Sequence, residues 1–232
     1  MRDVLTTQEA ARRLGVHPSR IRALIAAGTL TATRAGSQWL VDIESLDRQA
    51  DLIAAGATAR SFAPRIAWAA AALCDGLPDG MTYAERHRLR NRLAQTESGG
   101  AETCALVRRW LSQRAESLHR YRASERDLTA LLDTRGVMPT GISTASTYNL
   151  GLATGGAADA YVSEETRREL VNTHFLIDSD RGNLTLRIAS AAPGFPIAPR
   201  LIAGVDLADD TDSRSRAAGC RLISEALRAV RD

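Results

Sequence analysis

Near its N-terminus the chain places helix-capping residues and glycines at spacings that leave little choice of fold. Thr6 and Glu9 have the S/T-x-x-E spacing of a capping box, which begins a helix. Gly15 can end that helix because glycine readily adopts the left-handed conformation. Pro18 suits the first turn of a second helix, where no backbone N–H is needed, and Gly28 is placed to end it. These residues predict two short helices joined by a tight turn.

The residues that follow predict a hairpin and a third helix. Residues 30–34 and 38–41 are strand-like and flank a turn at 35–37. Asp42 is suited to cap a helix that begins at Ile43. The predicted order is helix, turn, helix, hairpin and helix, which is the order of a winged helix-turn-helix.

Residues 5–30 resemble the DNA-binding domain shared by MerR-type regulators and phage excisionases. The family pattern T-x-x-E-A-A-x-x-L-G-V matches this chain from Thr6 onward, and the expected arginine, isoleucine and glycine positions follow in order. The resemblance implies that the second helix enters the major groove of double-stranded DNA and that the hairpin, or wing, touches the backbone or the minor groove. The chain departs from complete MerR-type regulators, because Gly56 and Pro64 interrupt the place of their long dimerisation helix.

Candidate DNA contacts follow from the faces of these elements. Four residues of the second helix lie off its apolar face and are expected to point into the groove: Ser19, Arg20, Arg22 and Ala23. Arginine pairs bidentately with guanine, so Arg20 and Arg22 are the best base-reading candidates. The expected phosphate contacts are Arg34, Ser37 and Gln38 at the wing and Arg12 and Arg13 on the first helix. For each arginine, the alternative is a place on an ordinary solvated helix face.

Charge is distributed unevenly along the chain. All 30 of its lysine-plus-arginine positions are arginine, a bias that a GC-rich genome explains without any functional reason. Residues 1–48 carry seven arginines and five acidic residues, residues 60–135 carry thirteen and nine, and residues 136–232 carry ten and twelve. The basic front suits a polyanionic partner. Arginines 86, 88, 90 and 92 offer a second region that could contact DNA.

The whole pattern predicts an α+β protein in three parts. Residues 1–48 form the winged helix-turn-helix, residues 49–135 a linker and an arginine-rich helical region, and residues 136–232 an α/β domain for oligomerisation, effector sensing or partner binding. Helices are expected in the middle part at 65–74, 82–93, 102–121 and 124–132. The last part is expected to contain strands at 159–162 and 183–189, an apolar run at 197–205, and helices at 163–170 and 215–230.

Several classes of protein are excluded at this point. Cys74, Cys104 and Cys220 are far apart and odd in number, so we expect three small buried side chains rather than a disulfide framework or a zinc site. No apolar stretch is long enough to span a membrane, and the N-terminus lacks the apolar core of a signal peptide. We therefore expect a cytoplasmic protein with no membrane partner, no metal and no cofactor.

No catalytic set emerges from the sequence. The stretch 141–145 resembles a nucleophile elbow but lacks the second glycine of G-x-S-x-G. The glycines of 151–156 are not followed by the lysine that a phosphate loop needs. The carboxylates of 206–212 lack EF-hand spacing and are expected in an acidic turn. Arg187 and Arg200 either pair with these carboxylates or form a second basic surface. We expect a protein that is not an enzyme.

The predicted function is a sequence-specific DNA-binding transcriptional regulator that acts as a repressor. One small module buries little DNA surface, so repression calls for a homodimer or for a second DNA-contacting region. Segments 62–69, 183–187 and 198–207 resemble regulators with a C-terminal segment like that of abortive-infection (type IV) antitoxins. That resemblance implies an antitoxin that binds a cognate toxin and represses its own operon. A further alternative is an excisionase-like factor that bends DNA.

Overall fold

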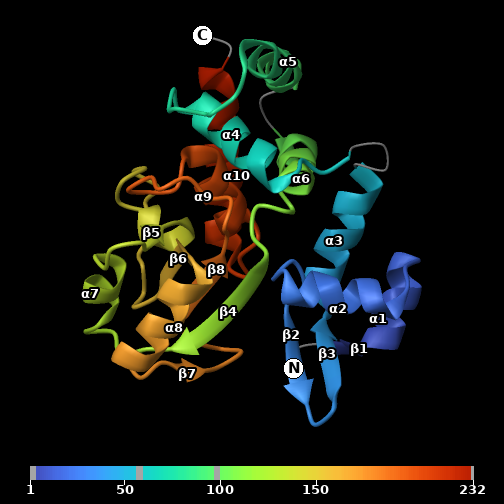
Figure 1. Ribbon diagram of the computed structural model, residues 1–232. Helices are drawn as coiled ribbons and strands as arrows, with labels where there is room; N and C mark the ends of the chain where they lie inside the picture. Colours follow the sequence, from blue (N-terminus) through green and yellow to red (C-terminus); the bar gives the residue numbers. More distant parts are fainter. Residues whose placement is uncertain (1–3, 56–59, 97–99, 231–232) are drawn as a thin grey trace.

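The computed structural model describes residues 4–55, 60–96 and 100–230. It is an α+β protein with 48% helix and 15% strand, as the sequence predicts. Figure 1 shows a small N-terminal unit and a larger body, with helix α3 leading from the first toward the second. This helix extends to Ala55, beyond the predicted domain end at residue 48. Residues 56–59 of the expected linker lie outside the described residues.

The N-terminal unit contains three helices and a small sheet. Its elements in chain order are β1 (Val4–Thr6), α1 (Thr7–Leu14), α2 (Pro18–Ala26), β2 (Ala32–Ala35), β3 (Gln38–Asp42) and α3 (Ile43–Ala55). The strand order is β1-β3-β2, with both outer strands antiparallel to β3. The predicted hairpin is confirmed, and β1 adds a strand that the sequence did not predict.

Local capping fixes where these helices begin and end. The Thr6 hydroxyl accepts from the Glu9 N–H at 3.3 Å, and the Glu9 carboxylate accepts from the Thr6 N–H at 2.8 Å. Gly15 ends α1 in the left-handed conformation, with φ 64°. The ring of His17 caps α2 by accepting from the Ser19 N–H. The capping box and the glycine stop predicted from the sequence are therefore confirmed. A closed apolar core holds the unit together: Ala10, Ala11, Ile21, Leu24, Leu30, Val41 and Leu46.

The body is built around a five-stranded mixed sheet. Its elements in chain order are α4 (Pro64–Cys74), α5 (Tyr83–Ala94), α6 (Gly100–Trp110), β4 (Ser117–Arg122), α7 (Leu128–Leu132), β5 (Met138–Pro139), η1 (Gly141–Thr144), β6 (Ala158–Val162), α8 (Glu164–Thr173), β7 (Ile177–Asp178), β8 (Leu184–Ile188), α9 (Arg200–Ala208) and α10 (Ser213–Ala229). The strand order is β5-β6-β8-β4-β7, and among the described strands only β6 and β8 form a parallel pair.

Strand β4 overturns the prediction of one long helix at 102–121. Helix α6 ends at Trp110, and residues 117–122 pair antiparallel with β8 and β7. The pairing partners lie more than 50 residues further along the chain, so the local helical pattern did not reveal them. The middle and last parts of the chain thus contribute strands to one sheet.

The sheet has one apolar and one polar face. On the apolar face, α7 and α8 cover alternate residues of β6 and β8, including Ala160, Val162, Leu184 and Leu186. The predicted strands and the Ser163-capped helix α8 are confirmed. The expected helix at 124–132 is shorter, because it begins at Leu128 and Ser124 does not cap it.

Helices α4, α5, α6, α9 and α10 form the second core of the body. The apolar run predicted at 197–205 enters α9 directly after Pro199, which fits the start of a helix. Asp206 lies inside α9 and is 2% exposed, so it does not belong to the expected acidic turn. Helices α9 and α10 cross closely, since an added Cβ on Gly219 would lie 2.5 Å from the Gly204 carbonyl oxygen.

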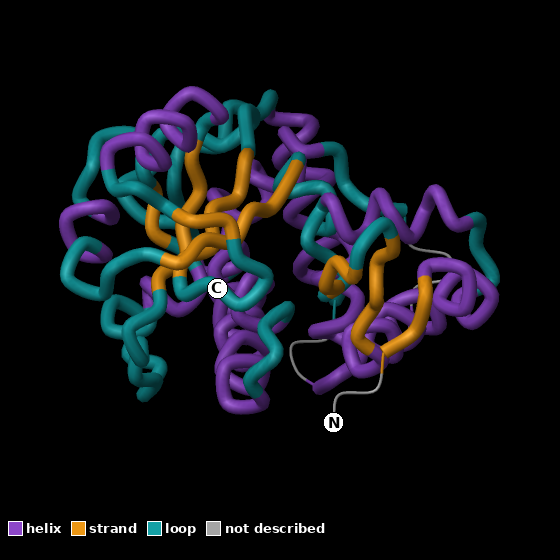
Figure 2. The backbone as a smooth tube through the Cα atoms, turned by 90° about the horizontal axis from the view of Figure 1, so that it is seen from below, coloured by secondary structure: helices purple, strands orange, loops and turns teal. Residues whose placement is uncertain are grey.

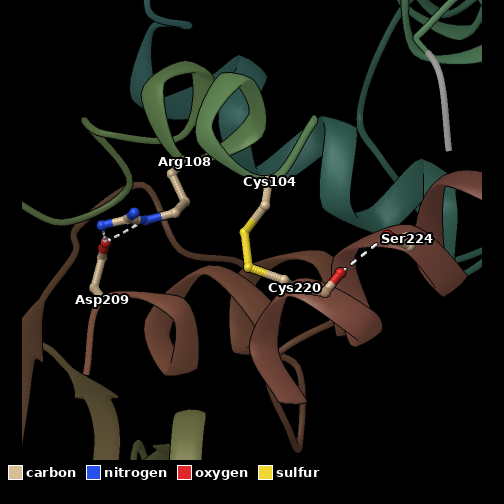
Figure 3. Close-up of a disulfide and its surroundings, with 5 residues drawn as sticks. All are labelled: Cys104, Arg108, Asp209, Cys220 and Ser224. Carbon is tan, nitrogen blue, oxygen red and sulfur yellow. Dashed lines mark hydrogen bonds and ion pairs between the residues drawn. A yellow bond between two sulfur atoms is a disulfide. The ribbon is translucent and has the colours of Figure 1, made fainter. Parts of the chain in front are cut away.

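A disulfide between Cys104 and Cys220 joins α6 to α10 (Figure 3). It corrects the expectation of three unpaired cysteines, and only the buried Cys74 is a free cysteine among the described residues. The two partners are 116 residues apart in sequence, a spacing that gives no local signal for pairing. In the same view the Arg108 guanidinium reaches Asp209, which adds a second link between α6 and the end of α9.

The two units meet along β4 and α6. Figure 2 shows them side by side. Gly28 follows α2 with φ 69°, and an added Cβ there would lie 2.5 Å from Leu118 Cδ1 on β4. The Arg34 N–H of the wing donates to Asp180 Oδ2 at 3.4 Å, and α3 lies against α6. The N-terminal unit therefore contacts the body close to its α2 helix and its wing.

Candidate nucleic-acid interface

The buried face of α2, the candidate recognition helix, determines which of its residues are exposed. Ile21 and Leu24 are buried in the core of the N-terminal unit, and the predicted groove residues are all exposed: Ser19, Arg20, Arg22 and Ala23. A residue advances about 100° around a helix, so Arg20 and Arg22 lie on opposite flanks of the exposed face. Within the described ranges neither guanidinium forms an ion pair or a hydrogen bond. Both arginines are available for an external anion.

The two flanks of α2 have different surroundings. Arg20 and Ala23 line a groove of about 530 Å³. The opposite wall is formed by Arg108 of α6 and by the segment 112–116 that follows this helix. Arg22 does not line this groove. A recognition helix inserts into a major groove about 12 Å wide, with DNA on both sides of it. In this arrangement the Arg22 flank offers the more open approach. The body residues opposite Arg20 could not be predicted from the sequence.

The wing residues Arg34, Ser37 and Gln38 are exposed around the hairpin turn. The Arg34 guanidinium lies 5.9 Å from the centre of the Trp39 ring, a cation–π distance. Asp178 and Asp180 line the same pocket as Arg34 and Trp39. The wing therefore has a basic side chain suited to phosphate and also an acidic neighbour from the body.

The two arginines of α1 differ in availability. Arg12 and Arg13 are both exposed, as a backbone contact requires. The Arg13 guanidinium lies 2.7 Å from the Asp47 carboxylate of α3, so it already has an anionic partner. A phosphate would compete with Asp47 for Arg13, whereas Arg12 forms no ion pair within the described ranges.

Most of the arginines of α5 contact other residues of the body. Arg86 forms two hydrogen bonds with the Asp79 carboxylate, and Arg90 donates to the Val230 carbonyl. The guanidinium of Arg92 lies 4.8 Å from the ring centres of both Phe62 and Trp110. All four side chains are exposed, and Arg88 is the one that forms no hydrogen bond, ion pair or ring contact in the described part of the chain. The structure thus gives this helix internal roles for three of its four arginines.

The elbow-like and acidic stretches have structural roles. The Ser143 hydroxyl accepts from the Asp159 N–H at 2.8 Å, and Asp212 caps α10 by accepting from the Ser215 N–H. Asp206 and Asp209 pair with arginines. Arg187 pairs with Asp206, one of the two possibilities raised by the sequence, whereas Arg200 pairs with Asp75.

The comparison with known proteins agrees with this geometry in one region. Residues 4–48 match the family model of a helix-turn-helix domain. No curated protein and no solved structure matches the chain. The chain therefore carries an N-terminal helix-turn-helix domain, which supports a DNA-binding regulatory protein in general terms. Along the described ranges, none of the helices combines the length and apolar character needed to cross a bilayer.

Proposed function

We propose that this protein is a sequence-specific transcriptional regulator that represses genes by binding double-stranded DNA. The observation that supports this role most strongly is the exposed pair Arg20 and Arg22 on α2, both free of ion pairs among the described residues. An arginine whose guanidinium is not committed internally can pair bidentately with guanine. The helix-turn-helix match of residues 4–48 supplies the element that presents them.

The proposed binding mode uses α2 for bases and the wing for backbone. Ser19 and Ala23 accompany the two arginines in the major groove, while Arg34, Ser37 and Gln38 contact phosphates. Arg12 adds a phosphate contact from α1. Because one module covers few base pairs, we further propose that two copies bind a palindromic site, with the body supplying the contact between copies. The role is non-enzymatic.

The test is a fluorescence-anisotropy titration of DNA from the protein's own upstream region at two salt concentrations. The double variant Arg20→Ala/Arg22→Ala should lose selectivity for one site over scrambled DNA. Each lost arginine–guanine pair is worth about 1–3 kcal/mol of discrimination. The matched control is Arg122→Ala/Arg135→Ala, which removes the same charge from two exposed arginines of the body.

The outcomes separate the proposal from its alternatives. Selective binding by wild type and by the control, but not by the α2 variant, supports the regulator. Equal, weak and strongly salt-dependent binding by all three proteins means that α2 does not recognise sequence. Cooperative binding to repeated sites with bending of the DNA favours the excisionase-like alternative instead. Light scattering of the DNA complex decides whether one or two copies bind.

A further inference from the structure

A cavity lies where the two units meet. It has a volume of about 400 Å³ and is lined by residues of both units. Ala27, Gly28 and Thr31 form the wall from the N-terminal unit, and strands β4, β6 and β8 form the opposite wall. Residues of the segments 180–183 and 206–211, which include four aspartates, also line the cavity. Small-molecule sites commonly measure about 300–1,000 Å³, so this junction cavity is large enough for a ligand.

The sheet presents a polar row to this cavity. Asp159, Thr185 and Arg120 lie directly opposite one another on the neighbouring strands β6, β8 and β4, and all three line the cavity. Directly opposed residues point to the same face, and adjacent strands are about 4.8 Å apart. The row therefore places an acid, a hydroxyl and a cation in sequence across one small surface.

The adjacent row on the same face shows how such charges are normally satisfied. There, Tyr161 and Arg187 are both covered by α9, because each donates to Asp206 Oδ1, at 3.2 and 2.8 Å. Helix α9 supplies no such partner to Arg120. Within the described ranges the Arg120 guanidinium forms no ion pair and no hydrogen bond.

The environment of Arg120 creates a need for an anion. Burial lowers the pKa of Arg120, and the neighbouring Arg187 lowers it further, while Asp159, Asp210 and Asp180 act in the opposite direction. The Arg120 guanidinium is half-buried and has no direct anionic partner, so these carboxylates offset its desolvation cost only in part. A carboxylate or phosphate group offsets it best, because it accepts two parallel hydrogen bonds from the planar fork.

The other end of the row favours a hydrogen-bond donor. Asp159 accepts from Arg187 through one oxygen at 2.9 Å. Burial raises the pKa of Asp159 to about 7, with Arg187 opposing the shift, so the carboxyl exchanges its proton near neutral pH. The Thr185 hydroxyl between the two charged groups can donate or accept. An amine, amide or hydroxyl of a ligand would find acceptors here.

We propose that the junction cavity binds a small polar molecule whose oxyanion is held by Arg120 and whose hydrogen-bond donors are directed at Thr185 and Asp159. Amino acids and nucleoside monophosphates share this chemistry, the first through a carboxylate and the second through a phosphate. Ala27 and Gly28 directly follow α2, so a ligand in the cavity contacts both units. The bound ligand therefore biases how the two units are placed relative to each other. This last part rests on the proposed DNA-binding function.

Isothermal titration calorimetry of the full chain tests the site without DNA. The probes are the common L-amino acids, the ribonucleoside monophosphates and inorganic phosphate, each at millimolar concentration. We expect one class to bind and Arg120→Gln to weaken it about tenfold to a hundredfold, the range for a hydrogen bond to a charged group. Arg122→Gln, an exposed arginine of the same strand outside the cavity, should bind like wild type.

A second variant keeps the test valid if Arg120→Gln does not fold. Thr185→Val preserves the shape and charge of the row and should also weaken binding. The proposal is overturned if no probe binds wild type, or if the folded variants bind as tightly as wild type. Binding of amino acids alone assigns the carboxylate source, and binding of monophosphates and free phosphate assigns the phosphate source.

The link to DNA is measured separately. The bound probe should change the DNA affinity of the wild-type chain, and DNA should change the probe affinity by the same factor. A probe that binds, depends on Arg120 and leaves DNA affinity unchanged retains the site and refutes the coupling. A chain that binds no DNA at all refutes the proposed function, while the calorimetric result still decides the site.

Discussion

The arginines of the N-terminal unit and those of the body are used in opposite ways. Arg20 and Arg22 on α2 are exposed and have no ion pair among the described residues. Arg114 and Arg187 in the body are 8% and 5% exposed, and both donate to Asp206 at 2.8 Å. The same residue type is thus left available for an external anion in one region and neutralises an internal one in the other.

This difference shows that an excess of arginine does not locate a binding surface. The sequence gives the segment 60–135 a larger positive excess than residues 1–48, yet its buried Arg114 pairs with Asp206 and Asp209. Burial would raise the pKa of Asp209, but Arg108 and Arg114 outweigh burial and hold it at about 2. Availability of the guanidinium, rather than net charge, separates the two regions.

The largest expected effect is on the buried network. Asp206→Ala removes the carboxylate that accepts from Arg114, Arg187, Tyr161 and Thr140. Leaving buried charges without a partner costs about 3–5 kcal/mol of unfolding free energy. Urea titration should show this loss for Asp206→Ala, whereas Arg22→Ala should stay within about 0.5 kcal/mol of wild type. Equal losses in the two variants would remove the contrast between the regions.

A pH series sharpens the contrast further. The pKa of Asp159 is raised from 3.8 to about 7, so the folded state binds its proton more tightly than the unfolded state. The contribution of Asp159 to the free energy of unfolding is fully present below pH 3.8 and is lost as the pH rises through about 7. Between pH 5 and 8 the wild type should lose about 3 kcal/mol that Asp159→Asn does not lose.

Asp209 serves as an internal control for this pH series. The pKa of Asp209 is lowered, so its contribution disappears only as the pH falls toward about 2 and does not disturb the window. Urea midpoints of wild type and Asp159→Asn that fall in parallel from pH 5 to 8 would mean that Asp159 titrates normally.

Two equivalent helix caps compare the units directly. Thr6 and Thr82 each accept from the N–H of the glutamate three residues later at 3.3 Å, in α1 and in α5. Losing such a cap costs about 1 kcal/mol. We expect Thr6→Ala to increase hydrogen exchange in α1 and to weaken DNA binding, and Thr82→Ala to increase exchange in α5 alone. Weaker DNA binding by Thr82→Ala would show that the two units are tightly coupled.

These caps also explain why the N-terminal unit could be predicted from the sequence and much of the body could not. Capping boxes, Pro18 and Gly15 act over three or four residues, so their signals are local. Strand β4 depends on partners in β8, and Cys104 depends on Cys220, both far along the chain. The exposure of the α2 site could be predicted from its apolar stripe, whereas the groove facing Arg20 and the acidic neighbours of the wing arise only when the units meet.

The smallest expected effect concerns those acidic neighbours. Asp180 accepts from the Arg34 N–H at 3.4 Å and places a negative charge beside the wing. If the wing contacts phosphates, Asp180 repels the DNA, and Asp180→Asn should tighten binding by about 0.3–1 kcal/mol, the usual worth of an exposed charge. The gain in DNA affinity should shrink at high salt because salt screens the repulsion.

The control is Asp133, an exposed acid at the end of α7, which covers the apolar face of the sheet. Asp133→Asn should leave the DNA affinity unchanged. Unaltered affinity in Asp180→Asn at low salt would mean that the wing moves away from the body when DNA binds, and the contrast between the regions would then rest on α2 alone.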